Sequence, residues 1–168
     1  MKFQKPSKVQ ERALPLLISN PYSSPNHLTD SSPRNMVGQS QSGTGKTAAF
    51  VLTMLSRIDY ATDAVQTICL APTRELARQI VDVVKEMGKF TPVRVTLAIR
   101  EAVKHSQVLK DHIVVGTPGT VMDLMKRRSL DARHVNVFVL DEADNMLDLQ
   151  GMGEQSMRVK TFEPPTET

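Results

Sequence analysis

The feature that most constrains this chain is a glycine-containing loop with a lysine and a threonine, placed between two apolar segments. The loop is Ser42-Gly43-Thr44-Gly45-Lys46-Thr47, between Asn35-Met36-Val37 and residues 47–58. Between a strand and a helix, a loop of this composition directs backbone N–H groups at phosphate groups. We therefore expect a short strand near 35–39, a helix over 47–58 and a nucleoside triphosphate held between them.

Each residue type in the loop suits a task. Gly43 and Gly45 can turn tightly and bring the backbone close to phosphate groups, where Ser42 and Thr44 complete the loop. Lys46 offers a positive charge to the β and γ phosphates, and the Thr47 hydroxyl can ligate Mg²⁺. The general pattern has a glycine where this chain has Ser40. The alternative is a glycine loop that merely caps a helix.

A second group of polar residues follows the apolar segment 135–140. It reads Asp141-Glu142-Ala143-Asp144, at the carboxyl end of a predicted strand, where open α/β sheets bind their ligands. Asp141 is expected to hold Mg²⁺, Glu142 to orient and activate the water that attacks the γ-phosphate, and Asp144 to bridge to other motifs. An acidic helix start, favoured by the helix dipole, is the alternative. The phosphate loop beside it favours the catalytic interpretation, with Lys46, Asp141 and Glu142 in catalysis.

Short β-branched apolar segments alternate with longer amphipathic ones, which predicts an α/β fold with a parallel sheet. We expect helices over 7–18 and 74–90, and strands near 35–39, 66–71, 94–99, 112–116 and 135–140. The Ser- and Pro-rich segment 21–33 is expected to be a mobile surface loop. The last ordered element should end near Val159, which gives one domain over 1–160 and a disordered tail over 161–168.

Composition narrows the class of protein further. A chain of 168 residues with 40% hydrophobic positions suits one globular domain. No segment approaches the roughly 18 apolar residues that span a bilayer, so we expect no membrane insertion and a soluble intracellular protein. A net charge of +3 permits a polyanionic partner without requiring one. An aromatic content of 4%, without Trp, argues against base stacking as the main way of holding nucleic acid.

Taken together, the phosphate loop and the Asp-Glu-Ala-Asp segment resemble the DEAD-box family of ATP-dependent RNA helicases. Residues 72–77, Pro-Thr-Arg-Glu-Leu-Ala, resemble the family's first RNA-contacting motif, and residues 117–119, Thr-Pro-Gly, resemble the next, with Thr120 where the family more often has Arg. The resemblance implies a RecA-like P-loop domain that uses ATP and Mg²⁺. It also implies sequence-independent contacts to the RNA backbone from a set of residues in these two motifs: Pro72, Thr73, Arg74, Thr117, Pro118 and Gly119.

A further resemblance concerns the amino-terminal segment. Phe3, Pro6, Ser7 and Gln10 resemble the element with which this family reads adenine. An amide has a donor and an acceptor, so Gln10 could pair with N6 and N7 of the base. Ser7-Lys8-Val9-Gln10 is also an S-x-x-Q capping box, in which Gln10 would bond to the backbone of Ser7 instead. The residues leave both roles open, and only the resemblance favours adenine.

Within the family, the chain is most similar to the branch that acts in messenger RNA export at the nuclear pore. The similarity lies in residues 39–42, 117–120, 141–148 and 150–151. It implies a protein of the nucleus and cytoplasm at the cytoplasmic face of the nuclear pore complex. It further implies a nucleoporin partner and an export activator that acts with inositol hexakisphosphate.

Family members continue with a Ser-Ala-Thr motif and a second RecA-like domain whose arginines reach the γ-phosphate, and these 168 residues hold neither. We therefore expect a C-terminally truncated domain that binds adenine nucleotide weakly, with almost no turnover alone. The alternative is a non-enzymatic truncated fragment that binds nucleotide, RNA or a nucleoporin. A GTPase is disfavoured because the guanine-reading Asn-Lys-x-Asp does not occur in the sequence.

Overall fold

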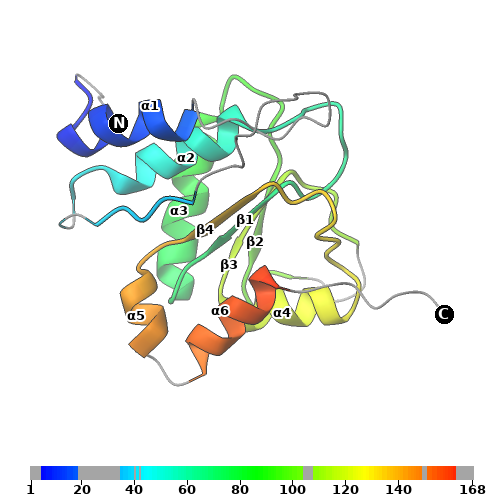
Figure 1. Cartoon of the computed structure of the whole chain (residues 1–168). Coiled ribbons are helices and arrows are strands. Elements are labelled where there is room, and N and C mark those ends of the chain that lie inside the picture. Colours follow the sequence, from blue (N-terminus) through cyan, green and yellow to red (C-terminus); the bar gives the residue numbers. More distant parts are fainter. Residues whose placement is uncertain are drawn as a thin grey trace, which may run out of the picture.

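Four parallel strands form the centre of the molecule, in the order β2-β3-β1-β4 (Figure 1). The computed structural model describes residues 5–18, 35–39, 41, 43–103, 108–148 and 151–161. The strands are β1 (Thr67–Leu70), β2 (Val95–Ala98), β3 (Ile113–Gly116) and β4 (Val137–Leu140). Because the strands are parallel, their carboxyl ends meet at one edge, and the loops that follow them can form a common site.

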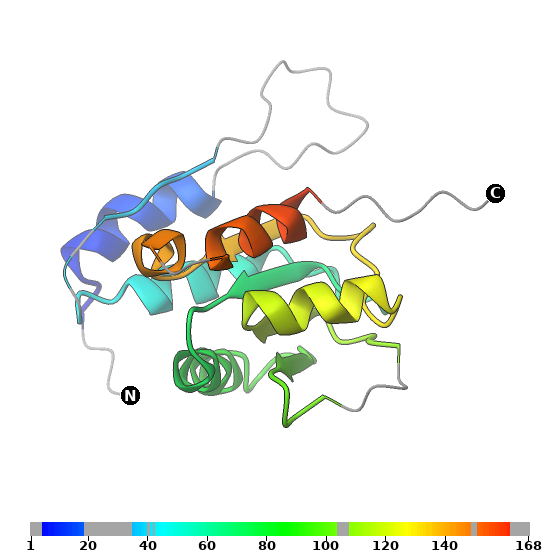
Figure 2. The ribbon, with the colours of Figure 1, turned by 90° about the horizontal axis from the view of Figure 1, so that it is seen from below.

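Helices cover both faces of this sheet. They are α1 (Lys8–Ile18), α2 (Lys46–Ser56), α3 (Arg74–Met87), α4 (Pro118–Lys126), α5 (Ala143–Asp148) and α6 (Met152–Lys160). Figure 2 shows α3 and α4 on opposite sides of the strands. Helix α2 lies next to α3, and α1 packs on α2, so α1 forms an outer layer on the side of the sheet that carries α2 and α3.

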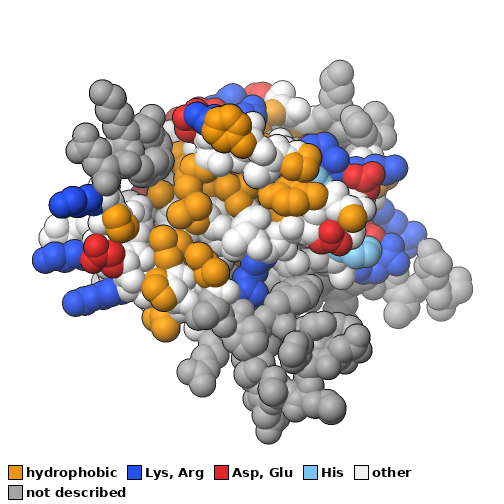
Figure 3. Space-filling view, turned by 90° about the horizontal axis from the view of Figure 1, so that it is seen from above, with side chains coloured by type: hydrophobic (Ala, Val, Ile, Leu, Met, Phe, Trp, Pro, Cys, Tyr) orange, Lys and Arg blue, Asp and Glu red, His pale blue; other side chains and the backbone are white. Residues whose placement is uncertain are grey.

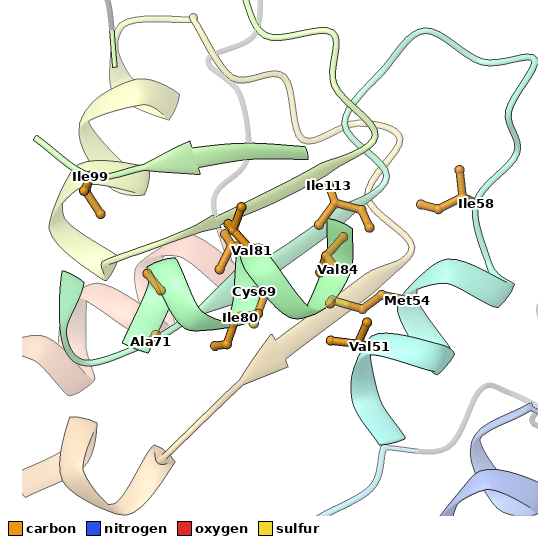
Figure 4. Close-up of a cluster of buried hydrophobic side chains, with 12 residues drawn as sticks. Val51, Met54, Ile58, Cys69, Ala71, Ile80, Val81, Val84, Ile99 and Ile113 are labelled. Carbon is orange, nitrogen blue, oxygen red and sulfur yellow. The ribbon is translucent and has the colours of Figure 1, made fainter. Parts of the chain in front are cut away.

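Alternating side chains of the strands divide the core between the two faces. Cys69 and Ile113 point to the side of α2 and α3, where they pack with Met54, Ile80 and other buried side chains (Figure 4). Ile68 and Leu70 of β1 and Val114 of β3 point to the other side of the sheet, towards α4, α5 and α6. Since β1 and β3 are buried on both faces, they read as continuous apolar segments in the sequence.

Most of the predicted elements are confirmed. The strands near 66–71, 94–99, 112–116 and 135–140 are β1 to β4, and the helices over 7–18, 47–58 and 74–90 are α1, α2 and α3. In α3 the apolar positions recur at helical spacing, the Thr73 hydroxyl caps the amino end, and Gly88 follows the last turn. Helix α6 ends at Lys160, next to the predicted end at Val159.

The strand predicted near 35–39 is wrong. Residues 35–39 pair with no strand of the described part of the chain (Figure 1). Val37 is 96% exposed. The prediction rested on two apolar residues, and so short a segment becomes a strand only where a partner strand lies beside it. The loop predicted over 21–33 and all but the first residue of the tail predicted over 161–168 lie outside the described residues.

Two negative findings hold for the part of the chain that the structure describes. None of its helices combines the length and the apolar character needed to cross a membrane. No three or more His, Cys, Asp and Glu side chains gather there in a way that could hold a metal ion by themselves.

Candidate functional site

The carboxyl edge of the sheet gathers the predicted motifs. The Asp141 N–H donates to the Leu70 carbonyl at 3.0 Å, so the ladder between β4 and β1 runs up to the acidic motif. On the other side of β1, the Ala71 N–H donates to Gly116 at 3.0 Å, just before Thr117. The motifs after β1, β3 and β4 thus begin at the same level, although Ala71 and Asp141 are 70 positions apart in the sequence.

The phosphate loop turns into α2 through left-handed glycines. Gly43 has φ 78° and Gly45 has φ 88°, conformations that side chains with a Cβ rarely adopt. The Thr44 hydroxyl donates to the Gln41 carbonyl at 2.8 Å, and Lys46 Nζ donates to the same oxygen at 3.5 Å. The loop is therefore folded onto the Gln41 carbonyl. Thr47 lies in the first turn of α2, and Ser42 lies outside the described residues.

Gln10 forms the capping box and also contacts the phosphate loop. Its Oε1 accepts from the Ser7 N–H at 2.9 Å, while its own N–H donates to the Ser7 hydroxyl at 3.3 Å. Its Nε2 donates to the Gly45 carbonyl at 3.2 Å. The capping alternative is thus realised in the structure, and the amide also ties α1 to the loop. Adenine reading by Gln10 stays a prediction, and Phe3 lies outside the described residues.

Asp141 is half-buried beside the loop. Burial raises the pKa of its carboxyl, a hydrogen bond from the Glu142 N–H at 3.1 Å lowers it, the Glu142 charge raises it, and the Lys46 charge lowers it. The net effect is a raised pKa. Since the Lys46 charge acts on this carboxyl, the phosphate loop and the acidic motif lie within electrostatic reach of each other.

Glu142 adopts an unusual backbone conformation. Its φ is 50°, in the left-handed region, and such local strain in a non-glycine residue is found preferentially at functional sites. Its Oε2 accepts from Asn145 Nδ2 at 3.0 Å, which fixes the carboxylate over the start of α5. Asp144 is exposed in the first turn of the same helix. Its predicted bridge to other motifs stays a prediction.

The predicted RNA-contacting residues divide into buried and exposed ones. Pro72 and Pro118 are buried, so their side chains do not face a ligand, and contacts at these positions would come from the residues next to them. Thr73 is exposed, but its hydroxyl accepts from the Leu76 N–H at 3.1 Å and caps α3. Arg74 is exposed beside it.

In the second motif, the Thr117 and Thr120 hydroxyls are hydrogen-bonded at 3.2 Å. Gly119 lies against α6, since a Cβ built there would be 3.2 Å from Gln155 Oε1.

Three polar residues at this edge were missed by the sequence analysis. Glu101 forms an ion pair with Arg74, Asn145 holds the Glu142 carboxylate, and Gln155 lies beside Gly119. Glu101 follows β2, so an inspection of the residues after every predicted strand would have found it. Nothing in the sequence brings Gln155 near Gly119, because that contact depends on how α6 packs on α4.

This arrangement suits a polyphosphate with a hard divalent cation. A Cβ at Gly43 would meet none of the described residues within 4 Å, so on their side the backbone of the loop is open to a ligand there. The Thr47 hydroxyl and the Asp141 carboxylate are oxygen donors, the kind that Mg²⁺ prefers together with phosphate oxygens. The residues present therefore fit Mg²⁺ with a nucleoside triphosphate.

Comparison with known proteins gives three results. The sequence profile described as DEAD/DEAH box helicase matches residues 7–167. The chain is 65% identical to the ATP-dependent RNA helicase dbp5 of Schizosaccharomyces pombe over 164 residues, which are 98% of this chain and 30% of that protein. It thus spans about a third of the length of its curated relatives.

The similar solved structures include two that match over 98% of this chain, each with 55% identity and a TM-score of 0.88. One is Saccharomyces cerevisiae Dbp5 bound to RNA and ADP BeF3, of which this chain covers 39%. The other is a variant of that protein bound to Nup159, a Gle1 variant, IP6 and ADP, of which it covers 41%. The predicted RecA-like fold is confirmed by this agreement.

Proposed function

This chain belongs to the DEAD/DEAH box helicase family, and from this premise we propose that it binds Mg-ATP and the RNA backbone as the first domain of an ATP-dependent RNA helicase. The observation that carries the proposal is the convergence of three motifs on one edge of the sheet. Arg74 follows β1 and Asp141-Glu142 follows β4 at that edge, and Lys46 of the phosphate loop is close enough for its charge to lower the pKa of Asp141.

Nucleotide binding would use the groups that now face Gln41. Lys46 and the Thr44 hydroxyl can leave the Gln41 carbonyl for phosphate oxygens, which carry more negative charge than a carbonyl. Thr47 and Asp141 would hold Mg²⁺, and the bound ion would neutralise charge on the phosphates. Glu142 would accept a hydrogen bond from the attacking water, and Asn145 would keep that carboxylate in place.

RNA would lie along the ends of β1 and β3. The Arg74 guanidinium can bind a phosphodiester with two parallel hydrogen bonds. The backbone around Thr117 and Gly119 offers a small polar surface beside it. Contacts of this kind hold the sugar-phosphate chain without reading bases, so we expect binding that is independent of sequence and weakens with salt.

The relatives suggest the cellular setting. The S. cerevisiae protein is bound to Nup159, Gle1 and IP6 in a solved structure, which supports a role in messenger RNA export for this chain. The partners would be a nucleoporin and an activator that acts with inositol hexakisphosphate, and the location would be the cytoplasmic face of the nuclear pore, between nucleus and cytoplasm. Turnover would need the arginines of a second domain. An arginine of that kind contributes roughly 10³- to 10⁵-fold in rate.

The test is a nucleotide titration. Purified chain is titrated with a fluorescent ATP analogue and Mg²⁺, and the analogue is then displaced with ATP or GTP. Lys46→Ala should abolish binding because it removes the charge that faces the phosphates. Gln10→Ala should abolish the preference for ATP over GTP. Ser7→Ala is the matched control, because it removes one bond of the same capping box and leaves the Gln10 amide.

The outcomes separate the proposal from its alternative. Equal loss of preference in Gln10→Ala and Ser7→Ala would assign Gln10 to the cap and remove its adenine role. No binding of the analogue to the intact chain would favour a non-enzymatic fragment that acts through RNA or a nucleoporin. RNA-stimulated hydrolysis at the rate of a two-domain helicase would contradict the need for a second domain.

A further inference from the structure

The Glu101 carboxylate forms an ion pair with the Arg74 guanidinium at the edge of the sheet where RNA is proposed to bind. The two side chains form an ion pair across 27 positions of sequence, with 56% of Arg74 and 51% of Glu101 exposed. Arg74 begins α3 after β1, whereas Glu101 lies in the loop after β2. β3 lies between these two strands, so the pair bridges over the end of the strand that leads to Thr117.

The loop that carries Glu101 is held at its base. The Ala102 and Val103 N–H groups both donate to the Ile99 carbonyl, at 3.0 and 3.3 Å. Ile99 is fully buried, and the preceding Ala98 carbonyl accepts from the Thr117 N–H at 3.3 Å. The carboxylate therefore stands on a short turn anchored to the core and to the second RNA motif.

The position favours an anion for a further reason. Arg74 is the first residue of α3, where free backbone N–H groups and the helix dipole attract negative charge. A carboxylate and a phosphodiester bind a guanidinium in the same forked geometry. Glu101 thus supplies from within the chain what a phosphate of RNA would supply from outside.

We propose that Glu101 acts as an internal substitute for an RNA phosphate, which holds Arg74 until RNA displaces it and thereby sets the affinity for RNA. The inference rests on the proposed RNA-binding function of this edge. Exposed ion pairs are weak, so the effect is one of tuning. Removing the Glu101 charge should strengthen RNA binding by about two- to fivefold. It should do so only where Arg74 is present.

The experiment is a double-mutant cycle on purified chain. The affinity for a fluorescein-labelled oligouridine is measured for wild type, Glu101→Gln, Arg74→Gln and the double variant, at one fixed salt concentration. Glu86→Gln is the control, because Glu86 forms a similarly exposed pair with Lys89 at the far end of α3 and its loss changes the net charge equally. In parallel, the Arg74 Nε–H resonance is followed by NMR during titration with inorganic phosphate.

The proposal expects tighter oligouridine binding in Glu101→Gln, weaker binding in Arg74→Gln, and no effect of Glu101→Gln in the Arg74→Gln background. An equal gain in both backgrounds, or in Glu86→Gln, would reduce the effect to net charge and overturn it. If no variant binds RNA, the proposed function fails at this edge. The phosphate titration then tests the inference by itself: the Arg74 resonance should shift at a lower phosphate concentration in Glu101→Gln than in wild type. If the two proteins need the same phosphate concentration, the inference is overturned as well.

Discussion

At Gly45 the phosphate loop contacts the amino-terminal helix α1. The Gly45 carbonyl accepts from Gln10 Nε2, and a Cβ at this position would lie 2.6 Å from that same nitrogen. Gly43, two residues earlier, has a similar left-handed backbone, but a Cβ there would meet no atom of the described part of the chain within 4 Å. Alanine substitutions at the two glycines therefore separate the destabilisation caused by backbone strain from that caused by collision with the Gln10 side chain.

Gly45→Ala should destabilise the chain more than Gly43→Ala. Both variants force a Cβ into the left-handed region, which costs about 1–2 kcal/mol. Gly45→Ala additionally pushes the Gln10 amide off the loop and breaks its bond to the Gly45 carbonyl. Urea unfolding without nucleotide measures the difference. Equal free energies of unfolding for the two variants would show that the Gln10 contact contributes nothing.

His112 is a buried titratable residue directly before β3, at the amino-terminal ends of the strands and thus away from the candidate site. Its Nδ1 accepts from the Arg94 N–H at 3.1 Å, and its ring stands edge-on to Tyr60. Its Nε2 has no hydrogen-bond partner among the described residues. Burial lowers its pKa below the usual 6.5, the Arg94 charge lowers it further, and three carboxylates act in the opposite direction: Asp63, Asp111 and Asp59.

This shift predicts a loss of stability in mild acid. As the pH falls, the unfolded chain takes up the proton first, so stability is full above about pH 6.5 and declines below it. Protonation also places a second donor against the Arg94 N–H. The Tm followed by circular dichroism between pH 5 and 8 should fall in acid for wild type. His112→Asn should flatten this trend, whereas His134→Gln, at an exposed position, should retain it.

At the scale of elements, sequence patterns predicted what depends on local chemistry. β1 and β3 are apolar on both faces, and α3 has a cap and a regular apolar stripe, so all three were found. The strand near 35–39 was not, because pairing depends on a neighbour that the local sequence does not encode. The same holds for the site. Motifs predict Lys46 and Asp141 as residues of the candidate site, whereas the places of Glu101 and Gln155 depend on how β2 and α6 pack.

The cap of α3 gives a prediction at this scale. The Thr73 hydroxyl bonds to the Leu76 N–H, one of the helix N–H groups that has no partner within the helix. Thr73→Ala should lower the free energy of unfolding by about 1 kcal/mol, and Thr73→Ser should restore most of it. Urea denaturation of the three proteins decides the matter. Unchanged stability in Thr73→Ala would leave the hydroxyl free for the proposed RNA contact.

At the scale of the whole molecule, two surfaces are available for association. β4 is at one end of the strand order, its side chains are only partly buried, and Leu140 is 38% exposed. Beside it is a cavity of about 200 Å³, whose lining includes Val137, Phe138 and Lys160. The second surface is the upper side of Figure 1, where apolar side chains gather (Figure 3). Exposed apolar residues of α1 and α2 include Leu16, Ile18 and Leu52.

We expect the chain to self-associate through β4 as its concentration rises. No described strand pairs with the outer edge of β4, and such an edge offers a row of free N–H and C=O groups to a second strand. Leu140→Lys should suppress this association, since a lysine on an edge strand carries its charge into any strand that pairs there. Leu52→Lys is the matched control, because Leu52 is also a leucine with 38% exposure but lies on α2. Sedimentation velocity over a range of concentrations measures both. If Leu52→Lys dissociates the chain and Leu140→Lys does not, association occurs through the helical face, and the β4 edge is protected in solution by some other part of the molecule.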